Sequence, residues 1–179
     1  MSRLTIYQET GEIEAEFQDY ENIRQRLLEA GIVLERWSTE KALAENASPD
    51  EVLAAYDSFI QRVKKERGYV TVDVVSLNPQ SPNIPELRAK FLDEHTHSED
   101  EVRFFVDGTG MFYIHKNSRV YMILCEKGDF INLPAGTKHW FDMGPRPFFK
   151  AIRLFNNPEG WVAHYTGDKI ADRFPKYEN

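Results

Sequence analysis

The chain is poor in cysteine. Cys125 is the only cysteine among 179 residues, so no internal disulfide can form and the fold must depend on noncovalent packing. Because disulfides persist in oxidising compartments, this composition fits a reducing environment, and we expect the protein in the cytoplasm. Cys125 stands between Leu124 and Glu126 at the end of an apolar segment. This setting predicts a buried thiol rather than a nucleophile.

Long apolar runs and an excess of positive charge are also absent from the sequence. No segment approaches the roughly 20 apolar residues of a membrane-spanning helix, and the first residues lack the pattern of a signal peptide. The chain has 22 Lys and Arg against 29 Asp and Glu, a net charge of -7. Surfaces that bind nucleic acid or anionic membranes are basic, so we expect neither as a partner.

The first part of the chain, residues 1–68, has the mixed pattern of an accessory region. Apolar residues at helical spacing predict a helix over residues 22–30. A second helix is predicted over residues 48–67, because Ser48 suits the N-cap and Glu51 suits the third helical position of a capping box. Strands are predicted at 4–7 and 32–37.

Residues 69–156 have β character instead. Short segments rich in valine, isoleucine and aromatic residues alternate with turn residues, a pattern typical of an all-β barrel or jelly roll. Strands are predicted at 69–77, 102–106, 111–115, 120–124, 130–133, 139–142 and 149–155. A short helix is predicted at 85–91, and a hairpin turn at 108–110.

The remaining residues, 157–179, are predicted to form a C-terminal loop and tail, weakly structured or pinned by Ile170 and Phe174. With a length that suits one domain, residues 1–179 are therefore predicted to form a single mainly β domain with N-terminal accessory α-helices.

Two histidines and a carboxylate are spaced so that an extended chain brings them together. Side chains alternate along a strand, so His95 and His97 share one face, and Glu101 shares it if the strand runs through Glu101. His139 opens a later strand, after a Pro-Ala-Gly turn. Imidazoles with one carboxylate suit a divalent transition metal. We therefore predict that these four residues bind one metal. The alternative, a buried polar cluster without metal, would leave several imidazoles without partners, which is costly.

The same face carries groups that suit an anionic ligand. Three imidazoles and a carboxylate leave two positions open on an octahedral metal, which suits a chelating oxygen ligand such as an enediolate. Arg103 can stabilise the negative charge of that ligand. Its alternative role is a salt bridge to Glu99 or Asp100. Phe105 and Phe141 are predicted to form apolar walls.

The spacing His-x-His-x3-Glu-x6-Gly over residues 95–108, followed by Gly-x5-Pro-x-Gly-x2-His over residues 128–139, resembles the paired motif of the cupin family. Ala89 and Met143 stand where that family usually has Gly and Asn. The segments FLDEHTH (91–97), EDEVRFFV (99–106), HWFDMG (139–144) and NPEGW (157–161) are similar to the acireductone dioxygenases of methionine salvage. The likeness covers nearly the whole chain and implies a cupin jelly-roll, a double-stranded β-barrel.

The resemblance implies a substrate, a cofactor and products. The substrate would be the acireductone 1,2-dihydroxy-5-(methylthio)pent-1-en-3-one together with dioxygen, and the cofactor one Fe(II) or Ni(II) per chain. The Fe(II) form would yield 4-methylthio-2-oxobutanoate and formate, and the Ni(II) form 3-(methylthio)propanoate, formate and carbon monoxide. The resemblance and the acidic surface favour a monomer. A metal- or ligand-binding cupin without activity, or a different cupin dioxygenase, remains an alternative.

The resemblance also implies roles for individual residues. Arg103 would generate or hold the substrate dianion. Glu94 would take part in metal incorporation, and Asp100 in relaying local conformational change. The thioether end of the substrate would be bordered by Phe91, Phe141 and Trp161. Strand alternation turns Glu94 and Asp100 away from the metal, which suits supporting roles but also suits ordinary surface acids.

Overall fold

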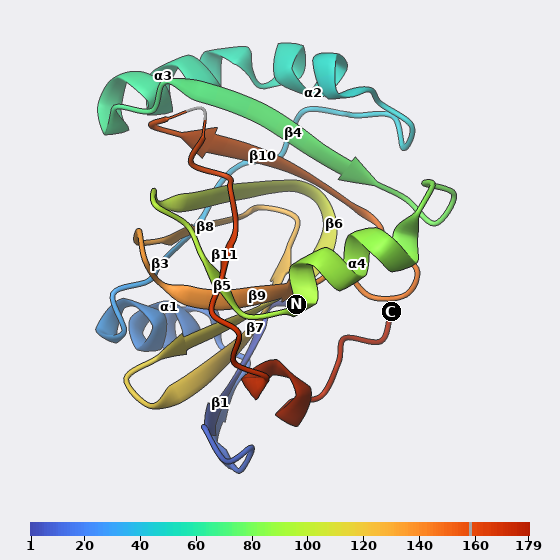
Figure 1. Ribbon diagram of the computed structural model, residues 1–179. Helices are drawn as coiled ribbons and strands as arrows, with labels where there is room; N and C mark the ends of the chain where they lie inside the picture. Colours follow the sequence, from blue (N-terminus) through green and yellow to red (C-terminus); the bar gives the residue numbers. More distant parts are fainter. Residues whose placement is uncertain (158) are drawn as a thin grey trace.

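A single long strand, β6 (Glu101–Lys116), connects the two sheets of the protein in the computed structural model, which describes residues 1–157 and 159–179. The first half of β6 pairs with β8 (Asp129–Leu133) and β10 (Phe149–Phe155), and its second half pairs with β7 (Arg119–Glu126) and β9 (Lys138–Asp142). All of these pairings are antiparallel, and Figure 1 shows the strands curving around a common interior. This arrangement confirms the mainly β, barrel-like fold class.

The remaining strands extend the two sheets at their edges. The sheet of β6, β7 and β9 is continued by β1 (Arg3–Gln8), β2 (Ile13–Phe17), β5 (His95–Thr96) and β11 (His164–Tyr165). The sheet of β6, β8 and β10 is continued by β3 (Val33–Arg36) and β4 (Thr71–Leu77). Strands of the accessory region therefore pair directly with barrel strands.

The prediction of a hairpin turn at 108–110 is wrong, because β6 runs through these residues without a break. Gly108 has a φ of 70° and lies next to a register shift in the pairing with β10. A β-carbon at this position would overlap the backbone of Phe148. The register shift leaves Val106 as the extra residue of a bulge, and Gly108 beside it lets β6 pass close to Phe148 as the strand bends from one sheet into the other. Closely spaced glycines occur in bulges as well as in hairpin turns, so the local sequence could not distinguish the two.

The helices cover the outside of the barrel. Figure 1 shows α2 (Pro49–Ala55) and α3 (Asp57–Arg67) over the face of β4 and β10, with α1 (Tyr20–Glu29) on the opposite side. The capping box forms as predicted: Ser48 Oγ accepts from the Glu51 N–H at 3.3 Å, and Glu51 Oε2 accepts from the Ser48 N–H at 2.7 Å.

The single helix predicted over 48–67 is two helices, with a break at Tyr56. The backbone there leaves the helical region, with ψ at 13°. The ring of Tyr56 packs edge-on against Phe59 and Phe104. This contact with the sheet turns the chain at a position where apolar periodicity alone predicts continuity. No helix in the described residues has the length and apolarity needed to cross a membrane.

Apolar side chains form three packed regions. The first fills the barrel interior and includes Phe105, Phe112 and Phe141. The second lies between α2, α3 and the outer face of β4 and β10. The third lies outside β6 and β9, where the C-terminal segment places Ile170 and Phe174, both at most 5% exposed, against the sheet. The prediction that these two residues pin the tail is confirmed, and Cys125 is buried as predicted.

Candidate metal centre

Three imidazoles meet at one end of the barrel interior. His95 on β5 lies opposite His139 on β9, and His97 follows β5 by one residue. One ring nitrogen from each of the three lies within 4.8 Å of the others. The Nδ1 atoms are engaged elsewhere, at 2.8–2.9 Å from the carbonyl oxygens of Asp93, Val162 and Thr137. The Nε2 atoms are therefore the ones available to a ligand, and the carbonyls fix the rings that carry them.

Glu101, the first residue of β6, completes the cluster. Its Oε2 lies 3.4 Å from Nε2 of His97 and in ion-pair contact with Nε2 of His139. The side chain is only 6% exposed. Neither Glu101 Oε2 nor His139 Nε2 makes a hydrogen bond of acceptable direction to any described residue. Buried polar atoms without partners are costly, so these atoms are arranged for a further partner.

The protonation behaviour of the cluster follows from its burial and its charges. Burial, and then the neighbouring His139, lower the pKa of His95 to about 4, so this ring is neutral at pH 7. Burial lowers the pKa of His97, but the adjacent Glu101 carboxylate outweighs it and raises the pKa overall. Burial also favours a protonated Glu101, yet Arg103 and His139 hold the pKa of this carboxyl well below its usual range. The cluster thus contains a carboxylate and neutral imidazole, the forms that bind metals.

The donor set fits a divalent transition metal. Three imidazole nitrogens and one carboxylate oxygen from separate elements point into one space. Their outer nitrogens are held by backbone carbonyls, and two of the inward atoms lack a hydrogen-bond partner. Nitrogen and oxygen ligands in this ratio suit iron, nickel or related metals.

A cavity of about 300 Å³ opens onto this cluster. Phe91 of α4 (Ile84–Leu92) and Trp161 line it, together with His95, His97, Glu101 and Arg103. Phe105 and Phe141 do not line the cavity. They are at most 1% exposed and form the packed layer beneath it, with Phe91 edge-on against Phe141. Strand alternation assigned these two rings to the correct side of the sheet but not to the correct depth.

Arg103 lies at the base of the cavity and is 5% exposed. Its guanidinium carbon is 4.6 Å from the ring centre of Phe141 and 5.1 Å from that of Phe112. Its Nε is 2.8 Å from Glu101 Oε1. Arg103 is therefore paired with Glu101, not with Glu99 or Asp100, the two partners considered in its alternative role.

The sequence pattern missed a second arginine in the cavity. Arg153 on β10 lies opposite Arg103 in the sheet register and lines the same cavity. A fork of two hydrogen bonds, at 2.8 and 2.5 Å, joins it to Asp73 on β4. Strand alternation was the only feature of the sequence that could have placed Arg153 in the cavity, because this residue lies about 50 residues beyond the histidine motif.

The acids next to the cluster have specific partners. Glu94 is 1% exposed, accepts a hydrogen bond from Thr166 Oγ1 at 2.8 Å and lies 2.5 Å from Nδ1 of His115. The other nitrogen of His115 lies 2.8 Å from Glu9. Asp100 accepts from the Ala135 N–H at 2.9 Å. Glu94 directly precedes β5 and Asp100 directly precedes β6, and these contacts hold each acid to another segment of the chain.

Comparison with known proteins identifies the family. The family model of the ARD/ARD′ family matches residues 3–163. The chain belongs to the ARD/ARD′ family. The acireductone dioxygenase of Pseudomonas aeruginosa strain UCBPP-PA14 is 56% identical over 181 residues, covering 100% of each chain. That of Yersinia enterocolitica is 52% identical over 180 residues, covering 99% of this chain and 100% of the relative.

A solved structure of the same family supports the fold. Acireductone dioxygenase from Bacillus anthracis, with a cadmium ion in its active centre, superposes with a TM-score of 0.81 at 31% identity. The match covers 92% of this chain and 98% of that one. In this ARD/ARD′ protein, the segment quoted for the resemblance over residues 157–161 is described except for Pro158, which lies outside the described residues.

Proposed function

We propose that the protein is an acireductone dioxygenase that cleaves 1,2-dihydroxy-5-(methylthio)pent-1-en-3-one with dioxygen. The observation that carries the proposal is the cluster of three imidazoles and one carboxylate that lines a cavity. Full-length similarity to proteins of this name supports it. The fold alone would not support the proposal, because cupin-like barrels carry out many different reactions.

His95, His97, Glu101 and His139 would hold one divalent metal. We infer that the metal is Fe(II) or Ni(II), which nitrogen-rich sites with one carboxylate accept. When bound, the metal supplies Lewis acidity and redox chemistry toward an oxygen-rich substrate. The chain supplies the fixed orientation of the four ligands through the carbonyls of Asp93, Val162 and Thr137 and through Arg103.

The cavity residues account for substrate binding. Arg103 presents a positive charge from a nearly buried position, where it would stabilise negative charge on the substrate oxygens. Phe91 and Trp161 border the space for the thioether end, and Phe105 and Phe141 support the floor beneath Arg103. Glu94 and Asp100 act as positioning residues, which hold β5 and β6 in place through His115 and Ala135.

The proposal also covers the setting of the enzyme. We infer a monomer in the cytoplasm, without nucleic-acid or membrane partners, since the net charge is -7 and cysteine is nearly absent. Oxygen uptake on mixing the metal-loaded protein with acireductone under air tests the activity itself. A binding protein without activity would consume no oxygen, and another dioxygenase would prefer a different enediol.

We predict that the bound metal determines the products. Iron and nickel differ in redox character and size, whereas the residues around the substrate stay the same. After removal of the metal by a chelator, portions reloaded with Fe(II) or Ni(II) under anaerobic conditions are mixed with acireductone and oxygen. Carbon monoxide is expected in the headspace of the nickel form only, and 4-methylthio-2-oxobutanoate from the iron form.

The metal-free protein treated in parallel is the control, and it should release neither product. Equal carbon monoxide from both metal forms would show that the metal does not direct the outcome. Its absence from both would confine this protein to the reaction that forms the keto acid.

We predict that Gly110→Ala disturbs the floor of the cavity. A β-carbon at Gly110 would overlap the ring of Phe141, whose face supports Arg103 at 4.6 Å. Overpacking of this kind costs about 1–3 kcal/mol of stability, and turnover should fall because Arg103 loses its position. Thermal unfolding and oxygen uptake measure the two effects.

Phe141→Leu in the Gly110→Ala background is the matched control, since the smaller side chain makes room for the added methyl group. The double variant should lose less free energy of unfolding than the two single variants lose when their losses are added. Strict additivity would mean that Gly110 and Phe141 are not coupled.

A further inference from the structure

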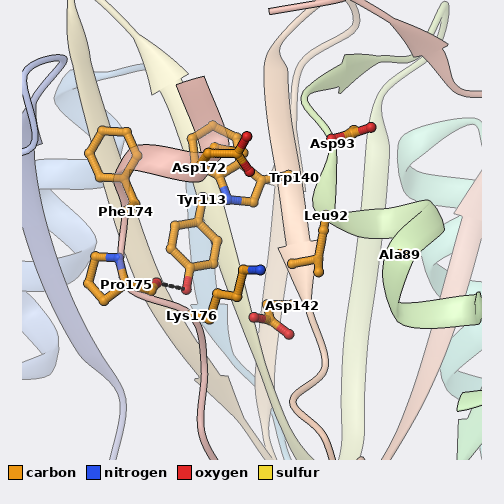
Figure 2. Close-up of a pocket in the computed structure, with 11 residues that line it drawn as sticks. Ala89, Leu92, Asp93, Tyr113, Trp140, Asp142, Asp172, Phe174, Pro175 and Lys176 are labelled. Carbon is orange, nitrogen blue, oxygen red and sulfur yellow. Dashed lines mark hydrogen bonds between the residues drawn. The ribbon is translucent and has the colours of Figure 1, made fainter. Parts of the chain in front are cut away.

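A second cavity, of about 240 Å³, lies on the outer face of the sheet, behind the strand that carries His139. It is enclosed by β6, β9, the end of α4 and the C-terminal segment, as Figure 2 shows. Its apolar surface comes from Leu92, Tyr113 and Phe174. The rings of Tyr113 and Trp140 are stacked, with centroids 5.1 Å apart and planes 10° apart. Nothing in the proposed reaction uses this space.

A donor without a hydrogen-bond partner in the described residues lines this cavity. Trp140 is 2% exposed, and within the described residues its indole N–H donates to no acceptor. The neighbouring phenol behaves differently, since Tyr113 Oη donates to the Pro175 carbonyl at 2.6 Å. The indole nitrogen of Trp140 is not among the fully enclosed atoms that lack a partner, so the N–H is open to the cavity and can donate to a ligand there. Figure 2 shows the Trp140 nitrogen directed at the centre of the cavity.

A cation points into the same space. Figure 2 shows the ammonium group of Lys176 between the ring of Tyr113 and the side chain of Leu92, directed toward the same centre. No carboxylate in the described residues lies within ion-pair distance of this group. Trp140 and Lys176 are both donors, so the complementary ligand group is an acceptor with negative charge.

The acidic residues of the cavity are mostly compensated. Both oxygens of Asp142 are occupied by the guanidinium of Arg88, at 2.7 and 2.9 Å, and by the N–H groups of Gly144 and Tyr177. Asp93 pairs with Lys169 at 3.2 Å. Asp172 lies at the exposed rim, where water screens its charge. The donors that remain for a ligand are therefore the Trp140 N–H and the ammonium group of the exposed Lys176.

We propose that this cavity is a second ligand site, which takes a small organic carboxylate with an apolar body. The carboxylate accepts from the Trp140 N–H and from Lys176. The apolar body lies against Tyr113, Leu92 and Phe174. Trp140 stands between His139 and Phe141 on β9, so the ligand would contact the reverse side of the strand that forms the candidate metal centre.

Binding of 4-fluorophenylacetate to the metal-loaded, full-length protein, followed by ¹⁹F NMR, tests the proposal. We expect saturable binding with a Kd at or below about 1 mM, and at least about tenfold weaker binding of the neutral analogue 4-fluorophenylacetamide. Trp140→Phe keeps the ring but removes the N–H, and Lys176→Gln removes the charge. Each should weaken binding of the carboxylate about tenfold.

Matched controls separate this cavity from the rest of the molecule. Lys65→Gln removes the charge of an exposed lysine on α3 that does not line the cavity, and Trp37→Phe makes the same ring change elsewhere. Both should bind the probe within twofold of the unaltered protein. Equal binding of the probe by all four variants would mean that it binds elsewhere and would overturn the proposal. A failure of binding to saturate by 10 mM, roughly tenfold above the expected Kd, would overturn it as well. Lys176 is exposed, so Lys176→Gln decides the matter even if Trp140→Phe fails to fold.

Discussion

Arg103→Ala is expected to keep its metal and to lose turnover by about a hundredfold or more. A guanidinium stays protonated and cannot be a ligand, and removing a positive charge near a divalent cation does not weaken the attraction of the remaining ligands for it. Removing one group that stabilises developing negative charge typically costs a factor of about 100–1,000 in rate. Metal content by elemental analysis and oxygen uptake with acireductone measure the two sides of this prediction.

Arg103→Lys is the matched control, because it keeps the charge but not the planar fork that lies between Phe112 and Phe141. Its turnover should fall between those of the alanine variant and the unaltered protein. Near-normal turnover in Arg103→Ala would reduce Arg103 to a structural partner of Glu101. Loss of metal in that variant would show that its main task is to fix the Glu101 carboxylate.

His139→Ala is expected to lose most of its metal while the barrel stays folded. His139 supplies the ligand from β9, and no other described residue can replace its position beside Glu101. Strong four-ligand sites have binding free energies of roughly 10–16 kcal/mol. The loss of one ligand should therefore cost about 3 kcal/mol, which is a factor of about 100 in affinity. Elemental analysis after gel filtration measures the retained metal.

His164→Ala is the matched control, since His164 lies on β11, is exposed and is not one of the clustered imidazoles. It should retain one metal per chain. Thermal unfolding of both variants without metal should match that of the metal-free parent, because the apolar clusters do not depend on the His139 ring. A full complement of metal in His139→Ala would contradict the four-residue assignment.

Several elements could be predicted because their causes are local. The N-terminus of α2 follows from the side chains of Ser48 and Glu51, which bond to the backbone within one turn. The alternation within β6 places Glu101 and Arg103 on one face, since the period of two is a property of the extended chain. The burial of Cys125 follows from its apolar strand. None of these features requires knowledge of distant segments.

The misplaced elements all depend on a distant contact. At Gly108 the strand continues next to a bulge at Val106 and does not turn, because β10, about 40 residues away in the sequence, pairs with it. The helix breaks at Tyr56 because the ring meets Phe104 on the sheet. Phe141 lies under Arg103 rather than in the cavity because Gly110 leaves room for its ring. In each case the deciding neighbour is far away in the sequence.

The sequence by itself determined the fold class, the family and the four residues that converge at the candidate metal centre. Their spacing is set by strand alternation and by turns, which are encoded locally. Only the tertiary structure decided how deep each side chain lies, which atom of each imidazole remains available, and that Arg103 pairs with Glu101. It also brought Lys176 of the C-terminal segment to the cavity beside Trp140. These features depend on packing between segments that meet only in the folded chain, where burial and the exclusion of water set the energy of each contact.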